Sequence, residues 1–345
     1  MSGAAAKRAR PGAASVARHA PAPPADAAGD PAALQAFHHN VYFDSYAHLA
    51  IHQEMLRDEA RTLAYRDALA ACADDIRGKV VLDVGAGTGV LSSACARVSR
   101  RGSERSRAHA HPPPVFAARA GARRVYAVEA SALAEQTRAV VAANGLSDVI
   151  TVLQSKVEDV QLPEQVDVIL SEWMGYALLY ENMLGSVLAA RDRWLRPGGL
   201  LMPSHATIWC APVTDEDRVD DVVRFWDDVY GIDMRVLAPA ALRCAFAEPV
   251  VESFPPQGVM TWPVPLRRLD LATLSPADVL PWEGRFDAVS LGRAPCHGLA
   301  IWFDCEFHST ASAKAAAARR RACRRRRLRR ACGSAPGLTI RPRTG

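Results

Sequence analysis

The sequence predicts an α/β protein with a doubly wound parallel sheet, followed by an all-β second domain. Strand-like apolar runs alternate with helical segments up to about residue 170, and a glycine loop at 85–89 follows the first of these runs. After Pro197-Gly198-Gly199 the chain changes to short alternating stretches that many prolines interrupt. Alternating strands and helices are typical of a parallel sheet, whereas closely spaced strands with turn residues are typical of an all-β domain.

The individual elements follow from local patterns. Apolar residues recur at helical spacing over 48–77, and Gly78 ends that run. Ser131 is expected to cap a helix that continues through Ala143 and closes at 144–145. Four largely apolar runs are predicted to be strands of the buried sheet: 80–84, 125–128, 150–153 and 166–170.

The chain also contains segments that fit neither domain. Residues 98–119 interrupt a helix with clustered arginines and with Pro112-Pro113-Pro114, which no helix tolerates. The predicted parts are, in order, a disordered leader at 1–36, an α/β domain at 37–199, a β domain at 200–310 with a helical insertion at about 215–237, and a disordered Arg/Ala-rich tail at 311–345.

Charge is distributed unevenly along the sequence. The 345 residues have a formal net charge of +5, but the segment from Lys314 to Gly345 holds 12 basic residues and no acidic one. Without this segment, the leader and residues 98–119, the remaining body has 21 basic and 34 acidic residues, a net charge near −13. A body of this charge favours a cationic partner over nucleic acid.

Composition excludes several other classes of protein. No apolar run approaches the ~18 residues that a membrane span requires, and the N-terminus lacks the apolar core of a signal peptide. The eight cysteines form no C-x-x-C pair, so neither a zinc cage nor a disulfide scaffold is indicated. We expect buried thiols in a reducing compartment.

The first motif with chemical meaning is the run from Asp83 through Gly85 and Gly87 to Gly89, at the end of a predicted strand. Its G-x-G-x-G spacing differs from the G-x-G-x-x-G of a dinucleotide site and suits a nucleoside with a cationic amino-acid tail, S-adenosylmethionine. Glu129 ends the next strand, where an acid usually binds ribose hydroxyls about 20 residues after the glycines. The alternatives are a tight turn without a ligand and a surface carboxylate.

A second motif places Glu172 and Glu181 on either side of the run Trp173-Met174-Gly175-Tyr176-Ala177-Leu178-Leu179-Tyr180. Two such carboxylates could bind a metal, act as acid and base, or clamp a planar cation, and they could also be solvated loop residues. Few metal-type ligands lie nearby, so we expect no metal. A guanidinium has five donors in a rigid fork that fits two carboxylates, and aromatic neighbours favour a cation.

The chain resembles the type I protein arginine N-methyltransferases from about Val41 to Phe307. Ala86 and the run Tyr126-Ala127-Val128-Glu129-Ala130-Ser131 favour one member of that family over its commonest relative. The resemblance rests on Tyr42-Phe43-x-x-Tyr46, His52-x-x-Met55, Asp58-Glu59-Ala60-Arg61-Thr62, VLDVGAGTGVLS at 81–92, RRVYAVEAS at 123–131, Lys156-Val157-Glu158, SEWMGYALLYENML at 171–184 and HGLAIWF at 297–303.

This resemblance implies a role for each matching residue. Arg61 would hold the carboxylate of the cofactor's methionine part, and Glu172 and Glu181 would be the catalytic pair that grips the substrate guanidinium. Tyr46 and Met183 would contact the substrate. The other implied cofactor residues are His52, Met55, Asp83, Gly85, Gly87, Glu129 at the ribose, and Val157 with Glu158 at the adenine.

The implied fold is a Rossmann-like S-adenosylmethionine-dependent methyltransferase domain followed by a β-barrel domain that is truncated here. The implied activity is transfer of methyl groups to arginine side chains of proteins such as histones, giving asymmetric dimethylarginine. The implied assembly is a homodimer formed through the helical insertion at 215–237. We expect it in the nucleus, compatible with the basic cluster of Lys7, Arg8 and Arg10, and without a membrane or a specific nucleic acid as partner.

The chain departs from the family pattern in two places. The family continues with further barrel strands and a Thr-His-Trp loop that helps to build the arginine pocket, but no His-Trp pair exists in this sequence. Residues 98–119 are extra, and their flanks at 95–97 and 120–122 would join smoothly. We interpret 98–119 and the tail as translated non-coding sequence, and we expect the printed chain to methylate poorly.

Other functions remain open at this point. A pseudoenzyme could bind cofactor or partner without transferring a methyl group. The arginines of 319–330 could bind RNA phosphates, although no interleaved aromatic residues accompany them. A small-molecule methyltransferase is a further alternative, against which the paired-glutamate loop argues.

Overall fold

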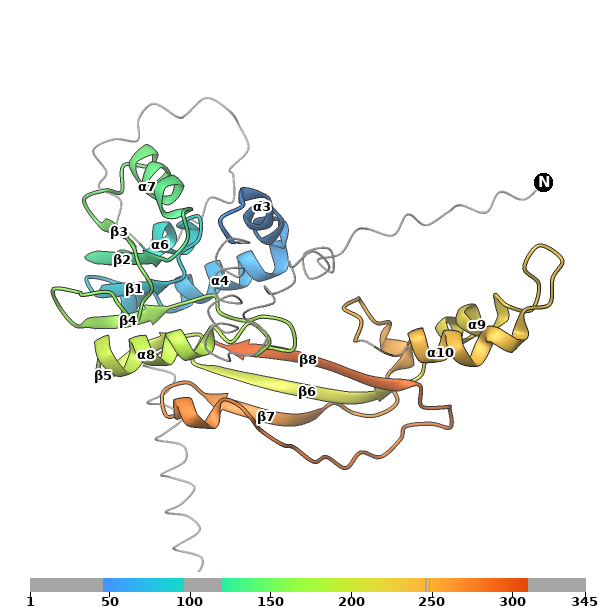
Figure 1. The fold of residues 1–345 in the computed structure, drawn as a ribbon. Helices are drawn as coiled ribbons and strands as arrows, with labels where there is room; N and C mark the ends of the chain where they lie inside the picture. The colour runs from blue at the N-terminus through green and yellow to red at the C-terminus, as the bar shows by residue number, and fades with distance from the viewer. Residues whose placement is uncertain (1–45, 96–119, 246, 248, 310–345) are drawn as a thin grey trace, which may run out of the picture.

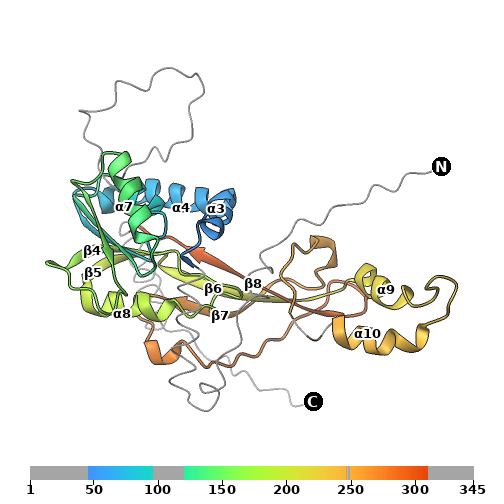
Figure 2. The ribbon, with the colours of Figure 1, turned by 45° about the horizontal axis from the view of Figure 1, so that its top comes forward.

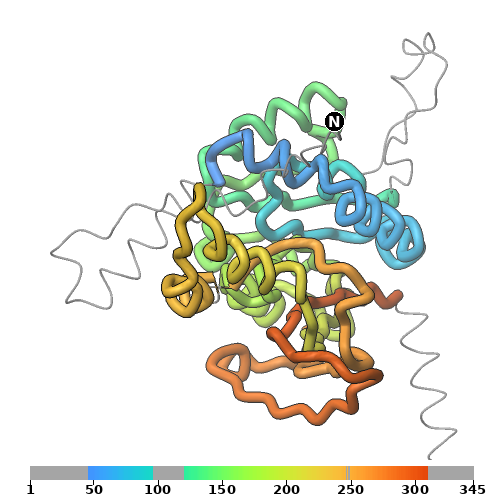
Figure 3. Tube along the Cα trace, turned by 90° about the vertical axis from the view of Figure 1, so that its right-hand side faces the viewer, coloured from blue at the N-terminus to red at the C-terminus, as the bar shows by residue number. Residues whose placement is uncertain are grey.

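A computed structural model of the chain describes residues 46–95, 120–245, 247 and 249–309. A helix-covered sheet lies at one end of the molecule, a second sheet extends from it, and a pair of helices projects from the far end (Figures 1 and 2). The view along the long direction shows the N-terminal half above the C-terminal half (Figure 3).

The first sheet has five parallel strands in the order β3-β2-β1-β4-β5. This order is that of a doubly wound sheet, so the predicted fold class is confirmed. The central strand β1 is buried along its whole length, because helices cover both faces of the sheet. The strands are β1 (Val80–Val84), β2 (Arg124–Glu129), β3 (Ile150–Gln154), β4 (Val166–Leu170) and β5 (Leu195–Met202).

Two apolar clusters form the core, one on each face of this sheet. Leu82 of β1 packs in the cluster that contains the buried face of α8, and Val81 packs in the cluster that contains α4, α6 and α7. The alternation of side chains along β1 therefore divides the core in two. The helices are α3 (Leu49–Arg57), α4 (Glu59–Ala71), α5 (Ala73–Ile76), α6 (Val90–Cys95), α7 (Ala134–Ala143) and α8 (Leu184–Trp194).

Two helix predictions need correction. The expected single run over 48–77 is three helices, because the chain breaks at Asp58 and Cys72, and the Asp58 carboxylate accepts a hydrogen bond from the Arg61 N–H at 3.2 Å. The helix expected to be capped by Ser131 begins at Ala134, and the Ser131 hydroxyl instead accepts from Leu133 N–H. Its predicted end is confirmed, with Gly145 at φ +65°.

The second sheet is antiparallel and has the order β7-β6-β8. It is built from β6 (His205–Val213), β7 (Val264–Asp270) and β8 (Gly298–Glu306), with short 3-10 turns η3 (Pro256–Gly258) and η4 (Pro276–Asp278). The predicted β domain is thus present as a three-stranded sheet in the described part of the chain. The predicted boundary at 199 falls inside β5, which pairs with β4 through Met202, so the first domain ends three residues later.

The helical insertion is longer than predicted and is interrupted. It consists of α9 (Glu216–Arg224), η2 (Arg235–Leu237) and α10 (Ala238–Ala245), so its last helix lies beyond the expected end at 237. A turn with Tyr230 at φ +55° and Gly231 at φ +84° joins the halves. α9 and α10 pack against each other away from both sheets (Figure 1).

The two sheets share one apolar cluster, in which Ile208 of β6 and Leu269 of β7 pack with Leu188 of α8. Two further contacts join them. The Arg191 guanidinium on α8 donates hydrogen bonds to the carbonyl oxygens of Leu271 and Leu274, at 2.6 and 2.8 Å, in the chain that follows β7. Beyond β8, the ring of Phe307 meets the ring of Tyr65 on α4 edge-on, with centroids 5.0 Å apart. The second sheet is therefore fixed against the helix that leads into the candidate site.

The flanks of 98–119 lie side by side. Ala120 N–H donates to the Ala94 carbonyl at 3.0 Å, and Ala122 N–H donates to the Cys95 carbonyl at 2.8 Å. If 98–119 were absent, these bonds would span four and five residues, with Gly121 at φ +82° between them. That is the usual glycine-terminated end of an α-helix, and α7 ends in the same way. This geometry supports the interpretation that 98–119 is inserted into the last turn of a helix.

We predict that a chain without residues 98–119 folds cooperatively and gains about 1–2 kcal/mol of unfolding free energy, because a long loop no longer has to be closed. Urea denaturation measures the change. In the shortened chain Gly121→Ala should cost about 1 kcal/mol, as should the matched change Gly145→Ala at the end of α7. Loss of cooperative unfolding after the deletion would contradict the insertion.

Candidate active site

The candidate site lies where the carboxyl ends of β1, β2 and β4 meet. The glycine loop follows β1, Glu129 ends β2, and the segment of Ser171 and Glu172 follows β4. β1 and β4 are neighbours although they are far apart in sequence, so the strand order changes direction between them. Doubly wound sheets bind ligands at this position.

The glycine loop is closely covered by two other parts of the chain. A Cβ on Gly87 would lie 3.3 Å from Nδ1 of the buried His52, and a Cβ on Gly85 would lie 2.3 Å from Cε of Met183. Both glycines have positive φ, +72° at Gly85 and +53° at Gly87. The backbone conformation therefore disfavours larger residues at both positions, and a Cβ would also require Met183 or His52 to shift.

Glu129 is turned toward this loop rather than toward solvent. Its side chain accepts the Gly87 N–H at 2.9 Å and the Ser131 N–H at 2.8 Å, and the residue is 8% exposed. The surface-carboxylate alternative is therefore wrong. Two backbone donors hold the carboxylate, and its other lone pairs are available to hydroxyl donors.

Asp83 is the most deeply buried charge-bearing group of the site. One carboxylate oxygen accepts the Ser92 hydroxyl at 2.6 Å, while the other, Oδ1, has no hydrogen-bond partner among the described residues. Burial raises the pKa of Asp83 to about 7, against the lowering effect of the Ser92 hydrogen bonds. Ser92 was not predicted as a site residue, although its position in the first turn of α6, directly after the glycine loop, could have indicated one.

Glu172 forms an ion pair with Arg61. The guanidinium Nη1 lies 3.2 Å from Glu172 Oε2, and both side chains are about one quarter exposed, 27% and 22%. Burial raises the pKa of Glu172, Arg61 lowers it, and Glu181 raises it again. The structure thus brings together the residue expected at the cofactor and one of the residues expected at the substrate.

Glu181 lies in the same loop and accepts a hydrogen bond from the Tyr46 hydroxyl at 2.6 Å. The Tyr46 carbonyl oxygen lies 2.8 Å from Nε2 of His52. Tyr46 therefore links the glutamate loop to His52, the side chain that lies against Gly87. A Cβ on Gly175 would lie 2.7 Å from Cγ of Glu181, so only glycine allows this approach. Tyr46, His52, Glu181 and Met183 therefore belong to one cluster.

The loop between the two glutamates is held in an unusual backbone conformation. Ala177 and Leu178 within this loop have positive φ without being glycine, at 48° and 73°, and so does Asn182 directly after Glu181, at 55°. Leu178 is 1% exposed and exchanges two backbone hydrogen bonds with Gly175, which compensates for this conformation. Strained backbone of this kind is concentrated at functional sites.

The remaining predicted residues are Met55, Val157 and Glu158. Met55 is half-buried on α3, one turn from His52. Val157 is buried in the core, whereas Glu158 is exposed and accepts the Ser186 hydroxyl at 2.5 Å. No contact joins Glu158 to the glycine loop, so its role at an adenine stays a prediction.

The residues of the site fit S-adenosylmethionine. A cation at Arg61 faces the position expected for the carboxylate of the methionine part, and Glu129 offers acceptors for ribose hydroxyls. The same strand edge also presents Gly85 and Gly87 in positive-φ conformations and Asp83 Oδ1, which has no hydrogen-bond partner among the described residues. A glycine-lined turn with an acid at the next strand end is the usual arrangement for a nucleoside.

Comparison with known proteins agrees with this reading. Residues 111–202 match the model of a methyltransferase domain, and residues 204–318 match that of the arginine methyltransferase oligomerization subdomain. The chain is 44% identical to "Probable protein arginine N-methyltransferase 6.1" of Oryza sativa subsp. japonica over 298 residues, 85% of this chain and 71% of the relative. The chain belongs to the protein arginine N-methyltransferase family. The two matched models meet at residue 203, directly after β5.

Further relatives place the chain within the arginine methyltransferases. It is 50% identical to "Probable protein arginine N-methyltransferase 6" of Arabidopsis thaliana over 275 residues, 80% of this chain but only 58% of that relative's length. A Trypanosoma brucei PRMT1 enzyme-prozyme heterotetrameric complex with AdoHcy superimposes with a TM-score of 0.62 at 39% identity, covering 77% of this chain and 75% of the other. The chain thus spans less than two thirds of the length of some relatives that it matches.

Two general findings complete the description of the chain. Within the described ranges, no three His, Cys, Asp or Glu side chains are grouped so as to hold a metal ion. In the same part of the chain, no helix has the length and apolarity that a membrane crossing needs.

The burial of Asp83 predicts a specific dependence of stability on pH. Its pKa is about 7 in the folded protein and near 3.8 in the unfolded chain, so the folded state binds the proton more tightly between these values. The stability from this protonated carboxyl is complete below pH ~4 and is lost as pH rises through ~7. Asp83→Asn removes the titration, so its unfolding free energy relative to the unaltered protein should rise by up to about 4 kcal/mol from pH 4 to 7.5.

Urea denaturation of the ligand-free protein at a series of pH values measures this difference. Asp74→Asn is the matched control, because Asp74 is fully exposed and its replacement should leave the pH curve unchanged. Parallel curves for Asp83→Asn and the unaltered protein would show that Asp83 does not titrate in this range.

Proposed function

We propose that this chain transfers methyl groups from S-adenosylmethionine to guanidinium nitrogens of arginine residues in proteins. The observation that carries the proposal is the loop after β4, which presents Glu172 and Glu181 beside the glycine turn and the Arg61 cation. The cofactor supplies an electrophilic methyl group when it is bound. Arg61, Glu129, Gly85 and Gly87 are the residues that would hold it.

The two glutamates can make a substrate guanidinium more nucleophilic. A guanidinium is protonated at any physiological pH, so none of its nitrogens is a good nucleophile. Two carboxylates can draw the positive charge toward the nitrogens that they bind and orient the remaining one toward the methyl group. The reacting nitrogen must lose a proton, and Glu172, whose pKa burial raises, can accept it.

The Arg61–Glu172 pair connects the two proposed sites. The two groups lie 3.2 Å apart. A guanidinium has five N–H donors, so Arg61 can bind a cofactor carboxylate with donors that do not face Glu172. Glu172 keeps its second oxygen for a substrate guanidinium, and the pair thereby places the two proposed sites side by side.

The finer features of the activity are part of the same proposal. The acidic body supports basic protein substrates, such as histone tails or Arg/Gly-rich segments. Resemblance to the type I enzymes supports asymmetric dimethylarginine as the product, and the cluster of Lys7, Arg8 and Arg10 supports a nuclear location. The interpretation of 98–119 as an insertion supports slow transfer by this chain.

The test uses S-adenosylmethionine labelled at the methyl group and an Arg/Gly-rich peptide. Glu172→Gln should lower transfer by about a hundredfold or more, since a guanidinium loses one of its two anionic partners. Calorimetry with S-adenosylhomocysteine should show near-normal binding by the variant, and NAD should not bind. Glu164→Gln is the matched control, because Glu164 binds Arg123 and Tyr126 away from the site.

Full activity of Glu172→Gln would overturn the mechanism. Cofactor binding by the unaltered chain without any detectable transfer would instead favour the pseudoenzyme.

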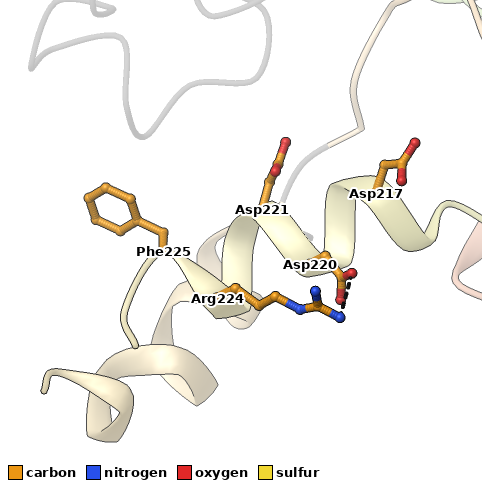
Figure 4. Close-up of a pocket in the computed structure, with 5 residues that line it drawn as sticks. All are labelled: Asp217, Asp220, Asp221, Arg224 and Phe225. Carbon is orange, nitrogen blue, oxygen red and sulfur yellow. Dashed lines mark ion pairs between the residues drawn. The ribbon is translucent and has the colours of Figure 1, made fainter. Parts of the chain in front are cut away.

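We further propose that the chain forms homo-oligomers through α9, η2 and α10. Apolar side chains there are exposed although the helices are ordered: Phe225 is 62%, Ile232 55% and Val236 85% exposed. Figure 4 shows Phe225 at the end of α9, beside a hollow lined by Asp217, Asp220, Asp221 and Arg224, where Arg224 pairs with Asp220 at 2.9 Å. Apolar groups rimmed by charges are typical of a surface that another protein covers.

The double substitution Phe225→Ser and Ile232→Ser should weaken self-association by at least about tenfold, because buried apolar anchors dominate such interfaces. Light scattering over a range of protein concentrations measures the mass. The matched control is Leu299→Ser on β8, which is 56% exposed but lies outside the projecting helices. A monomeric unaltered chain, or equal weakening by the control, would contradict the proposed surface.

A further inference from the structure

Ser171, the residue before Glu172, is a junction between four elements. Its N–H donates to the carbonyl of Met202 at the end of β5 at 3.0 Å, and its hydroxyl donates to the carbonyl of Val84 at the end of β1 at 2.8 Å. Its own carbonyl oxygen accepts the hydroxyl of Tyr65 on α4 at 2.9 Å. Each polar group of this fully buried residue therefore has a partner.

Tyr65 stands one helical turn after Arg61 on α4, so both side chains project from the same side of the helix. Arg61 binds the carboxylate of Glu172, and Tyr65 binds the carbonyl of the preceding residue. One helix thus holds Glu172 from both its side chain and its backbone. The Tyr65 hydroxyl also lies 3.6 Å from Sδ of Met174, which follows Glu172 by two residues in the chain.

The chemistry of Tyr65 suits a fixed donor. The residue is 3% exposed, and burial raises the pKa of its hydroxyl well above the ordinary value, as do the nearby Glu172 and Cys305. The group therefore stays protonated throughout the physiological range. A buried carbonyl that loses its donor has no water to replace it, so the segment would shift until it finds another partner.

We propose that Tyr65 is a positioning residue that fixes Glu172 for the substrate guanidinium by holding the Ser171 carbonyl. The assignment rests on the proposed function, because it gives Glu172 a guanidinium to bind. Tyr65 itself reaches neither ligand: it acts through the backbone at Ser171, which the Val84 contact ties to the start of the glycine loop. The hydroxyl thereby sets the substrate glutamate at a fixed place relative to the cofactor loop.

A purely structural role makes a different prediction. The Tyr65 ring packs edge-on against Phe307, and that contact serves stability whether or not the hydroxyl is present. Tyr65→Phe keeps the ring and removes only the donor. A structural role would change unfolding alone, whereas a positioning role changes recognition of the guanidinium and depends on the Glu172 carboxylate.

The experiment is a double-mutant cycle on binding of an Arg/Gly-rich peptide, measured by calorimetry with the full chain saturated with S-adenosylhomocysteine. Tyr65→Phe should weaken peptide binding by about tenfold, and the same change in a Glu172→Gln background should have almost no effect. Binding of S-adenosylhomocysteine, measured separately, should be unchanged in each variant and reports that the protein is folded. Tyr126→Phe, which removes a buried tyrosine hydroxyl that binds Glu164 at 3.2 Å, is the matched control and should bind peptide normally.

The outcomes are distinct. If the unaltered chain binds cofactor but no Arg/Gly-rich peptide, the proposed function fails and the assignment fails with it. If the unaltered chain binds the peptide and Tyr65→Phe binds it equally well, or weakens it equally in both backgrounds, the assignment alone is overturned. Should Tyr65→Phe not fold, Tyr65→Met removes the same donor and keeps an apolar side chain, and an unchanged peptide affinity in that variant would overturn the assignment.

Discussion

Parallel pairing of β4 beside β1 is the constraint on which the rest of the structure depends. The two strands are separated by β2, β3 and α7 in the chain, yet Val81, Leu82 and Asp83 lie opposite Val168, Ile169 and Leu170. Because parallel strands end at the same edge, this register places the glycine loop next to the glutamate loop. The Ser171 hydroxyl on the Val84 carbonyl then fixes the two loops to each other across that edge.

Around this edge, acidic and basic side chains lie close to one another. Arg61 faces Glu172, and Glu181 is held by Tyr46, while Asp83 and Glu129 are buried and bound by hydroxyl and backbone donors. Among the described residues, Asp83 Oδ1 has no hydrogen-bond partner, and burial raises the pKa of Glu172. The proposed cofactor and the proposed arginine substrate carry charges opposite to those of Arg61 and Glu172, so the proposed reaction depends on charge as well as on shape.

The second sheet is linked to the helix that carries Arg61, and the projecting helices extend from its far end (Figure 1). Phe307 packs on Tyr65, and Arg191 ties α8 to the chain after β7, so the sheet supports the helix that presents Arg61. The helices beyond β6 contribute nothing to the described core, and their apolar residues remain exposed. The contact with Tyr65 and the proposed surface for self-association thus lie at opposite ends of the second sheet (Figure 1).

The sequence by itself predicted the fold class and four strands of the parallel sheet, which the structure confirms. Its glycine run after an apolar strand and its paired glutamates indicated where a site could lie, whereas residues such as Arg61 followed only from the family resemblance. The sequence also marked 98–119 as a break in a helical pattern, since proline runs cannot continue a helix. Only the tertiary structure decided that Arg61 pairs with Glu172, that Ser92 binds Asp83, and that Tyr65 holds Ser171. These contacts join residues from 9 to 111 positions apart, and such distances in sequence leave no local pattern. The breaks at Asp58 and Cys72 and the extension of β5 to Met202 were likewise invisible, because capping and strand pairing depend on neighbours that only the folded chain brings near.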